Sequence, residues 1–203
     1  RAASLICGLE ILRRQKEEVY GLEEIRIGAW LGSAVTPNRW KGAVSAFKEA
    51  AQNGDPLKFI LRRCPWCGAE MGQTNSKSLK AVGFSVVPLK ADTDRIHVWC
   101  PDRECPFTDK KTTGNNGQVL HRGIPLYEVD EGVYLSRPDF VVGTIDKVAR
   151  IGWVPSSQRL FGLHNGERNA PPPSLFIQDE LHLISGPLGS IDGPFEAMLE
   201  HLC

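Results

Sequence analysis

The sequence predicts an α/β fold in which helices cover both faces of a parallel sheet and a metal-binding β module is inserted into one connection. Three observations support this prediction. Short apolar runs bounded by turn residues, typical of buried parallel strands, occur at Phe140–Gly143 and Leu175–Ile177. Segments with helical apolar spacing alternate with extended ones. Four of the six cysteines form two closely spaced pairs in the middle of the chain.

Composition narrows the class of protein. The 203 residues are 41% hydrophobic and 24% charged, as in ordinary globular proteins, and the formal net charge is zero. Any surface for nucleic acid must therefore be local. No apolar stretch approaches the ~20 residues of a membrane span, and the sequence at Arg1–Ser4 does not have the form of a signal peptide. We therefore expect a cytoplasmic protein without membrane contact, whose paired cysteines bind metal instead of forming disulfides.

The first third of the chain predicts a helix, a strand and a second helix. An amphipathic helix is expected over residues 1–19, since apolar side chains recur there at Leu5, Ile6, Leu9 and Leu12. A strand is expected over Ile25–Leu31. Thr36 followed by proline predicts a helix start, and Gly54 predicts its end. The buried face of this second helix is predicted to comprise Trp40, Val44, Phe47 and Ala51.

Residues 61–120 predict a structural zinc module. Two short-spaced pairs, Cys64/Cys67 and Cys100/Cys105, can surround Zn²⁺ with four thiolates and leave no position for a catalytic water. A redox dithiol is a weaker alternative. His97 could compete as a ligand, although its neighbours alternate as in a strand hairpin. The predicted hairpin strands are Phe84–Leu89 and Arg95–Trp99, residues 110–118 are predicted to form a loop, and Cys7 and Cys203 are expected in the core.

Polar residues follow both of the predicted buried strands. Thr144 follows the first and has the form of a helix cap, whose free amides could bind a phosphate; a plain strand–cap–helix is the alternative. Asp179 and Glu180 follow the second, where a carboxylate pair can hold Mg²⁺ through water and polarise an attacking water. The alternative for this pair is an exposed acidic turn at the end of a strand.

With Gly143–Lys147 and Gln178–His182 placed after predicted strands, the chain resembles the first RecA-like domain of superfamily 2 helicases. It is most similar to the large helicase-like proteins of the DISARM antiphage system, and residues 176–189 are the most specific part of the resemblance. The resemblance implies a partial RecA-like sheet. Its first part would be residues 1–60, the zinc-binding insertion residues 61–120, and its second part, with motif II, residues 121–203.

This resemblance also implies an activity. The whole protein would couple ATP hydrolysis to movement on DNA in antiphage defence, together with other subunits of a defence complex. Asp179 would hold Mg²⁺ through water, Glu180 would orient and deprotonate the attacking water, and His182 would link the nucleotide and DNA sites. Thr144 and Lys147 would contact the DNA backbone.

One departure from the family pattern limits this expectation. No Gly-x-x-x-x-Gly-Lys-Ser/Thr phosphate-binding loop occurs, and the nearest phrase, at Gly72–Ser78, lacks the second glycine. We therefore expect a fragment of a motor domain that cannot hydrolyse ATP alone. Two other functions remain open: a non-catalytic zinc-bearing module that binds nucleic acid, and a metal-dependent nuclease using Asp179, Glu180 and His182.

Overall fold

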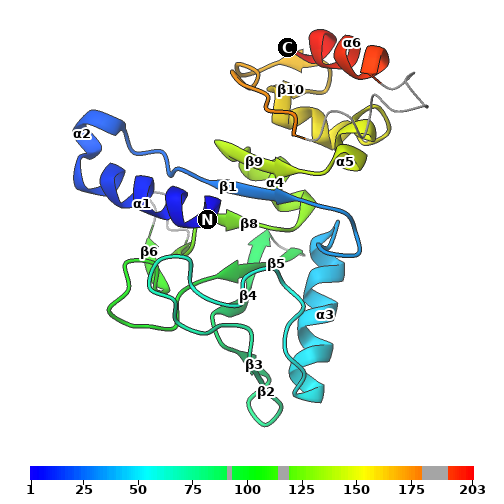
Figure 1. The fold of residues 1–203 in the computed structure, drawn as a ribbon. Helices are drawn as coiled ribbons and strands as arrows, with labels where there is room; N and C mark the ends of the chain where they lie inside the picture. The colour runs from blue at the N-terminus through cyan, green and yellow to red at the C-terminus, as the bar shows by residue number, and fades with distance from the viewer. Residues whose placement is uncertain (91–92, 114–118, 180–191) are drawn as a thin grey trace. The chain divides into compact units, whose positions relative to one another are not determined.

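A computed structural model describes residues 1–90, 93–113, 119–179 and 192–203 (Figure 1). The chain divides into two compact units, Arg1–Gly143 and Thr144–Cys203, which are described separately. In the described part of the chain, no helix is both long and apolar enough to span a membrane.

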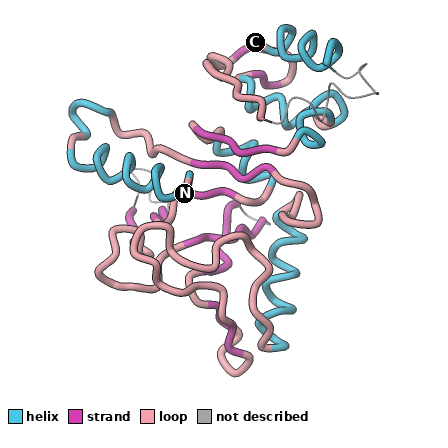
Figure 2. Tube along the Cα trace, in the orientation of Figure 1, coloured by secondary structure: helices cyan, strands magenta, loops and turns pink. Residues whose placement is uncertain are grey.

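A three-stranded parallel sheet lies at the centre of the first unit. Its strands are β8 (Leu126–Tyr127), β1 (Ile27–Trp30) and β9 (Phe140–Gly143), in that order, which confirms the predicted α/β class (Figure 2). The prediction that β9 is fully buried is wrong, because Phe140 and Val142 are 44% and 43% exposed. Among the described strands β9 pairs with β1 alone, which leaves part of its surface uncovered.

Helix α3 (Trp40–Asn53) has the buried face predicted for it, comprising Trp40, Val44, Phe47 and Ala51. Gly54 ends it in the left-handed conformation, with φ of 76°. The predicted start is wrong: the Thr36 hydroxyl donates to the carbonyl of Leu31 and does not cap the helix. The amide of Trp40 instead donates to the carboxylate of Glu131 at 2.7 Å. Glu131 lies in α4 (Asp130–Ser136), a short helix that the sequence did not predict.

Helix α1 (Ala2–Gln15) and the short α2 (Glu17–Tyr20) occupy the predicted N-terminal helical segment. The predicted apolar face of α1 is wrong, since Leu5, Leu9 and Leu12 are 66%, 40% and 56% exposed. The face that is buried carries Ile6, Cys7, Glu10 and Arg13. Its two charged side chains neutralise each other in an ion pair of 2.7 Å, which a hydrophobic pattern does not register.

The middle of the chain forms the predicted β module. A four-stranded antiparallel sheet comprises β2 (Thr74–Asn75), β3 (Lys80–Ala81), β4 (Phe84–Lys90) and β5 (Thr93–Val98). A separate two-stranded sheet comprises β6 (Lys110–Thr113) and β7 (Val119–Arg122). The loop predicted for residues 110–118 is therefore wrong over β6, and residues 114–118 lie outside the described residues. Strands β4 and β5 confirm the predicted hairpin.

One hydrophobic core serves both the parallel sheet and the β module. Its buried members come from α1, β1, α3 and the module, and include Ile6, Ile27, Trp40, Phe84, Ile96, Cys100 and Phe107. The β module therefore packs into the same interior as the parallel sheet.

The second unit holds short elements: α5 (Ile145–Ala149), η1 (Ile151–Trp153), η2 (Pro155–Phe161), β10 (Leu163–His164), β11 (Glu167–Arg168) and α6 (Asp192–Leu202). The buried strand predicted at Leu175–Ile177 is wrong. These residues form no strand, and Leu175 and Ile177 are 71% and 81% exposed. A parallel strand needs strand neighbours, and the described residues of this unit offer only the β10–β11 hairpin. Phe176 stacks instead on Phe161, with ring centroids 5.9 Å apart.

Candidate metal centre and the predicted ATP motif

Two tight turns bring four thiols together. In the first, the amide of Gly68 donates to the carbonyl of Cys64 at 3.0 Å, and Gly68 has a φ of 80°, which favours glycine. In the second, the amide of Cys100 donates to the carbonyl of Phe107 at 2.8 Å, and that of Cys105 donates to Asp102 at 3.2 Å. These backbone bonds define the two turns that carry the four cysteines.

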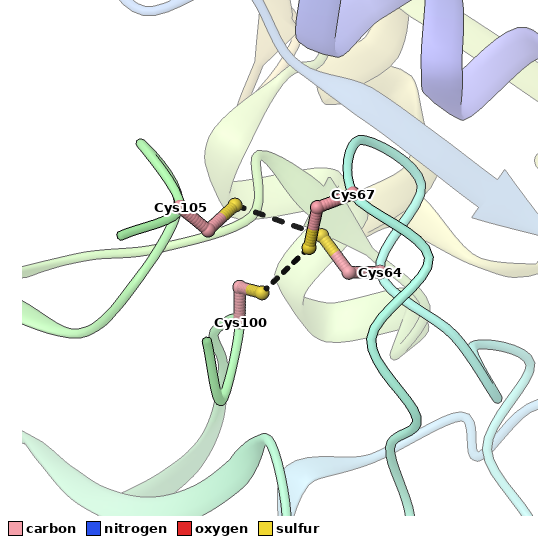
Figure 3. A group of neighbouring side chains, drawn as sticks. All are labelled: Cys64, Cys67, Cys100 and Cys105. Atoms are coloured by element: carbon pink, nitrogen blue, oxygen red, sulfur yellow. Dashed lines mark hydrogen bonds between the residues drawn. The ribbon is translucent and has the colours of Figure 1, made fainter. Parts of the chain in front are cut away.

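The four sulfur atoms converge on one point (Figure 3). All four Sγ atoms of Cys64, Cys67, Cys100 and Cys105 lie within 4.8 Å of one another. The Sγ atoms of Cys64 and Cys105 are 3.9 Å apart, and those of Cys67 and Cys100 are 3.4 Å apart. A tetrahedral Zn²⁺ with bonds of about 2.3 Å separates its sulfur ligands by about 3.8 Å. The cluster can therefore hold a metal ion, and its dimensions are compatible with zinc.

The surroundings of the thiols favour a cation between them. Three of the four cysteines are buried, and only Cys67 is exposed. Burial raises the pKa of Cys105 to about 11 and also raises the pKa of Cys100. Thiols packed this closely cannot all ionise beside one another unless a positive charge compensates them. A bound metal ion supplies that charge and deprotonates its thiol ligands.

Among the described residues, the cluster includes neither His97 nor Cys7. His97 on β5 contacts the carboxylate of Asp109, with Nε2 and Oδ1 3.2 Å apart, which confirms its assignment to the hairpin. Cys7 is 1% exposed in the core, as predicted, and burial raises its pKa to about 12. The prediction that Cys203 is a core residue is wrong: it follows the end of α6 and is exposed.

Helix α1 contacts the second cysteine turn directly. The guanidinium carbon of Arg14 lies 5.1 Å from the centroid of the Phe107 ring, in a cation–π arrangement, and Arg14 Nη1 donates to the carbonyl of Pro106 at 3.2 Å. Phe107 is fully buried and also contacts Trp66 of the first turn edge-on, at 6.4 Å between centroids. The metal centre is thus coupled to the N-terminal helix through one aromatic residue.

Of the residues predicted to act on ATP and DNA, Thr144, Lys147 and Asp179 are described and belong to the second unit. Glu180 and His182 fall outside the described residues. Asp179 is exposed. Thr144 occupies the N-cap position of α5, as predicted, without a capping hydrogen bond from its side chain. Lys147 is only 6% exposed.

The phrase nearest to a phosphate-binding loop forms the turn of a hairpin. Between β2 and β3, the side-chain oxygen of Asn75 accepts hydrogen bonds from the amides of Lys77 and Ser78, at 3.0 and 3.1 Å. A phosphate-binding loop instead joins a strand to a helix. This segment therefore does not have the form of a phosphate-binding loop.

A buried acid beside a small cavity was missed in the sequence. Glu128 is 4% exposed, and its Oε2 accepts a hydrogen bond from the amide of Ile60 at 2.7 Å. Its Oε1 and the Nε1 of Trp40 have no hydrogen-bond partner among the described residues, and both side chains line a cavity of about 60 Å³. Such a cavity has room for about two water molecules. No sequence signal marks Glu128, because its role depends on a residue 68 positions away.

Comparison with known proteins gives one informative match. No protein-family model matches the chain. The DISARM protein DrmA of Bacillus paralicheniformis is 29% identical over 93% of this chain, and the match covers 18% of that protein. The match supports a relationship to DISARM, and the chain spans less than a fifth of the length of this relative.

Proposed function

We propose that this chain is part of a cytoplasmic ATP-dependent DNA helicase or translocase that acts in antiphage defence within a complex of several subunits. The similarity to the DISARM protein DrmA over 93% of the chain carries this proposal. The parallel sheet is compatible with part of a RecA-like domain interrupted by a metal-binding insertion. On this view residues 1–60 and 121–203 belong to the motor, and residues 61–120 are the insertion.

The metal would be a structural Zn²⁺ held by Cys64, Cys67, Cys100 and Cys105. When bound, zinc supplies a cross-link between the two turns, whose outermost cysteines Cys64 and Cys105 are 41 residues apart, and it supplies no catalytic water because sulfur takes all four positions. The backbone bonds of the two turns shape the segments that carry the thiols, and the zinc ion would supply the positive charge that lets all four thiols ionise.

The chemistry would come from the acidic motif of the second unit. Asp179 would bind Mg²⁺ through water in the presence of ATP, Glu180 would orient and deprotonate the attacking water, and His182 would link the nucleotide site to the DNA site. The exposure of Asp179 supports this assignment, because it leaves the carboxylate within reach of solvent. Thr144 and Lys147 would contact the DNA backbone after a change that exposes them, because the Oγ1 of Thr144 is buried and Lys147 is only 6% exposed.

The test uses the full-length protein. Glu180→Gln is nearly isosteric and should keep ATP and DNA binding while lowering DNA-dependent ATP hydrolysis by about 10²-fold or more, the contribution expected of general-base catalysis. Asp179→Asn should in addition weaken Mg²⁺-dependent nucleotide binding. Glu200→Gln, at an exposed position on α6, is the matched control and should retain the wild-type rate.

The outcomes separate the motor from its alternatives. Cells carrying the defence system with Glu180→Gln should lose protection in a phage plaque assay. Loss of DNA cleavage with unchanged ATPase would identify a nuclease instead. Wild-type rates of ATP hydrolysis in Glu180→Gln would refute the assignment of this motif.

A further inference from the structure

Strands β6 and β7 form a two-stranded ribbon that carries three cationic side chains and no anionic one. The segment from Lys110 to Arg122 contains three lysine or arginine residues and no aspartate or glutamate, in a chain whose net charge is zero. The three cations, Lys110, Lys111 and Arg122, are all exposed. We call β6 and β7 together the basic ribbon. None of the ion pairs found within the described ranges involves its three cations.

The register places these charges on both faces of the ribbon. Lys110 is directly opposite Arg122 in the antiparallel pairing, so these two side chains share one face. Lys111, the next residue along β6, points to the opposite face. Like charges directly opposite each other destabilise a strand pair, and a polyanion bound to the ribbon would remove that repulsion.

Both ends of the basic ribbon are fixed to β5. Asp109, the residue before β6, contacts His97 through its carboxylate at 3.2 Å. After β7, the amide of Ile124 donates to the carbonyl of Val98 at 2.9 Å. A Cβ at Gly123 would overlap this same carbonyl oxygen, so only glycine permits so close an approach. Since Cys100 lies just beyond β5, the metal centre and the ribbon share one anchoring strand.

We propose that the basic ribbon binds duplex DNA by lying in a groove, with its cations against the phosphates of both walls. The major groove, about 12 Å wide, admits a two-stranded ribbon. Positive charge on both faces of the ribbon matches a DNA groove, which has phosphates on both sides. Single-stranded DNA has one phosphate backbone, and one charged face of the ribbon would be enough to bind it. The inference rests on the proposed function in taking DNA as the partner, and it adds the surface and the form of DNA.

The test measures the salt dependence of DNA binding by the full-length protein. Fluorescence anisotropy with a labelled 20-base-pair duplex, and with one of its strands, is followed between roughly 50 and 200 mM NaCl. Lys110→Gln/Lys111→Gln should reduce the slope of log Kd against log salt by about two, since each phosphate contact contributes about 0.9. The affinity for the duplex should fall at least about 10-fold at 100 mM NaCl, and that for the single strand much less.

Lys77→Gln/Lys80→Gln is the matched control. It removes two exposed lysines at the β2–β3 turn of the same module and should leave the slope unchanged. If Lys110→Gln/Lys111→Gln loses its zinc or its fold, the single variant Arg122→Gln is measured in its place. It should reduce the slope of log Kd against log salt by about one, and an unchanged slope would refute the inference.

Three results would overturn parts of this reasoning and can be told apart. A ribbon variant with the wild-type slope refutes the inference while leaving the proposed function intact. Equal losses for duplex and single strand refute binding in a groove. A wild-type protein that binds no DNA refutes the proposed function itself.

Discussion

Removing the carboxylate of Glu10 should destabilise the first unit more than the loss of any exposed charge. Glu10 is fully buried and accepts two hydrogen bonds from Arg13, at 2.7 and 2.9 Å, and one from Arg14 at 2.6 Å. It also accepts one from the amide of Ile25 at 2.9 Å, just before the central strand β1. One carboxylate therefore ties α1 to the sheet, and through Arg14 to the cysteine turns.

The expected magnitude follows from what Glu10→Ala leaves behind. Breaking a buried ion pair by removing one partner costs about 3–5 kcal/mol, because the remaining charge is buried without compensation. The Arg13 side chain is 3% exposed but keeps a hydrogen bond to the carbonyl of Gly21 at 2.8 Å and an ion pair with the partly exposed Glu17 at 3.6 Å, which favours the lower part of this range. We therefore expect a loss of about 3–4 kcal/mol in the free energy of unfolding. With a slope of about 2 kcal/mol per M, the urea midpoint should fall by roughly 1.5–2 M.

Urea unfolding followed by tryptophan fluorescence measures this change, since Trp30 and Trp40 are 4% and 5% exposed in the same unit. Glu23→Gln is the control: the Glu23 side chain is 96% exposed, and its nearest cation, Arg26, is 4.0 Å away. Its effect should stay within about 0.5 kcal/mol. A Glu10→Ala protein within 1 kcal/mol of wild type would refute the view that this network holds α1 in place.

The same network predicts a pH dependence with a definite sign. Burial alone would raise the pKa of Glu10, but hydrogen bonds from Arg13, the Ile25 amide and Arg14 outweigh it and hold the pKa below its usual value of 4.5. A carboxylate with a lowered pKa stabilises the fold above that usual value, and this contribution disappears as the pH falls through the lowered pKa. The difference in stability between wild type and Glu10→Ala should therefore shrink below about pH 4.5.

Two further predictions concern the metal centre and Glu128. The purified chain should contain about one zinc ion, and chelation should lower the unfolding midpoint of the whole first unit because the core is shared. Cys64→Ser should lose the metal, and Cys203→Ser should keep it. A folded preparation without metal would contradict the prediction. Burial raises the pKa of Glu128 to about 7, so the wild type should lose stability as the pH rises from about 4.5 through 7. Glu128→Gln stays neutral and can still accept from the Ile60 amide; denaturant midpoints between pH 5 and 8 should therefore fall less than in wild type, and parallel curves would argue against a buried titrating carboxyl.

The features that the sequence predicted depend on neighbouring residues. The cysteine turns have local backbone requirements, which Pro65 and Gly68 indicate at the first pair and prolines at the second. Helix α3 was predicted because its apolar spacing and its terminal Gly54 both appear within one short stretch. The parallel strands β1 and β9 were found as short apolar runs, although the burial of β9 was not.

The features that escaped prediction depend on distant partners. The amide of Trp40 is bound by Glu131, 91 residues away, so the local Thr36–Pro37 signal was misleading. The buried face of α1 holds an ion pair, whose burial no hydrophobic pattern indicates. Whether the Leu175–Ile177 run forms a strand depends on neighbouring strands that could pair with it, and its own residues do not indicate whether such strands are present.

The order of the parallel sheet has a consequence for synthesis on the ribosome. Strand β1 pairs with β8 and β9 in the described part of the chain, and its contacts span separations such as 104 residues from Trp30 to Tyr134. At roughly 5–20 residues per second, the ribosome needs several seconds or more to make the missing partners. Cys64 and Cys105 are only 41 residues apart, so the two cysteine turns can come together and bind an ion before β9, a pairing partner of β1, has been synthesised. Because the module shares its core with the sheet, a metal ion bound at this stage would stabilise one side of that core before β8 and β9 are available.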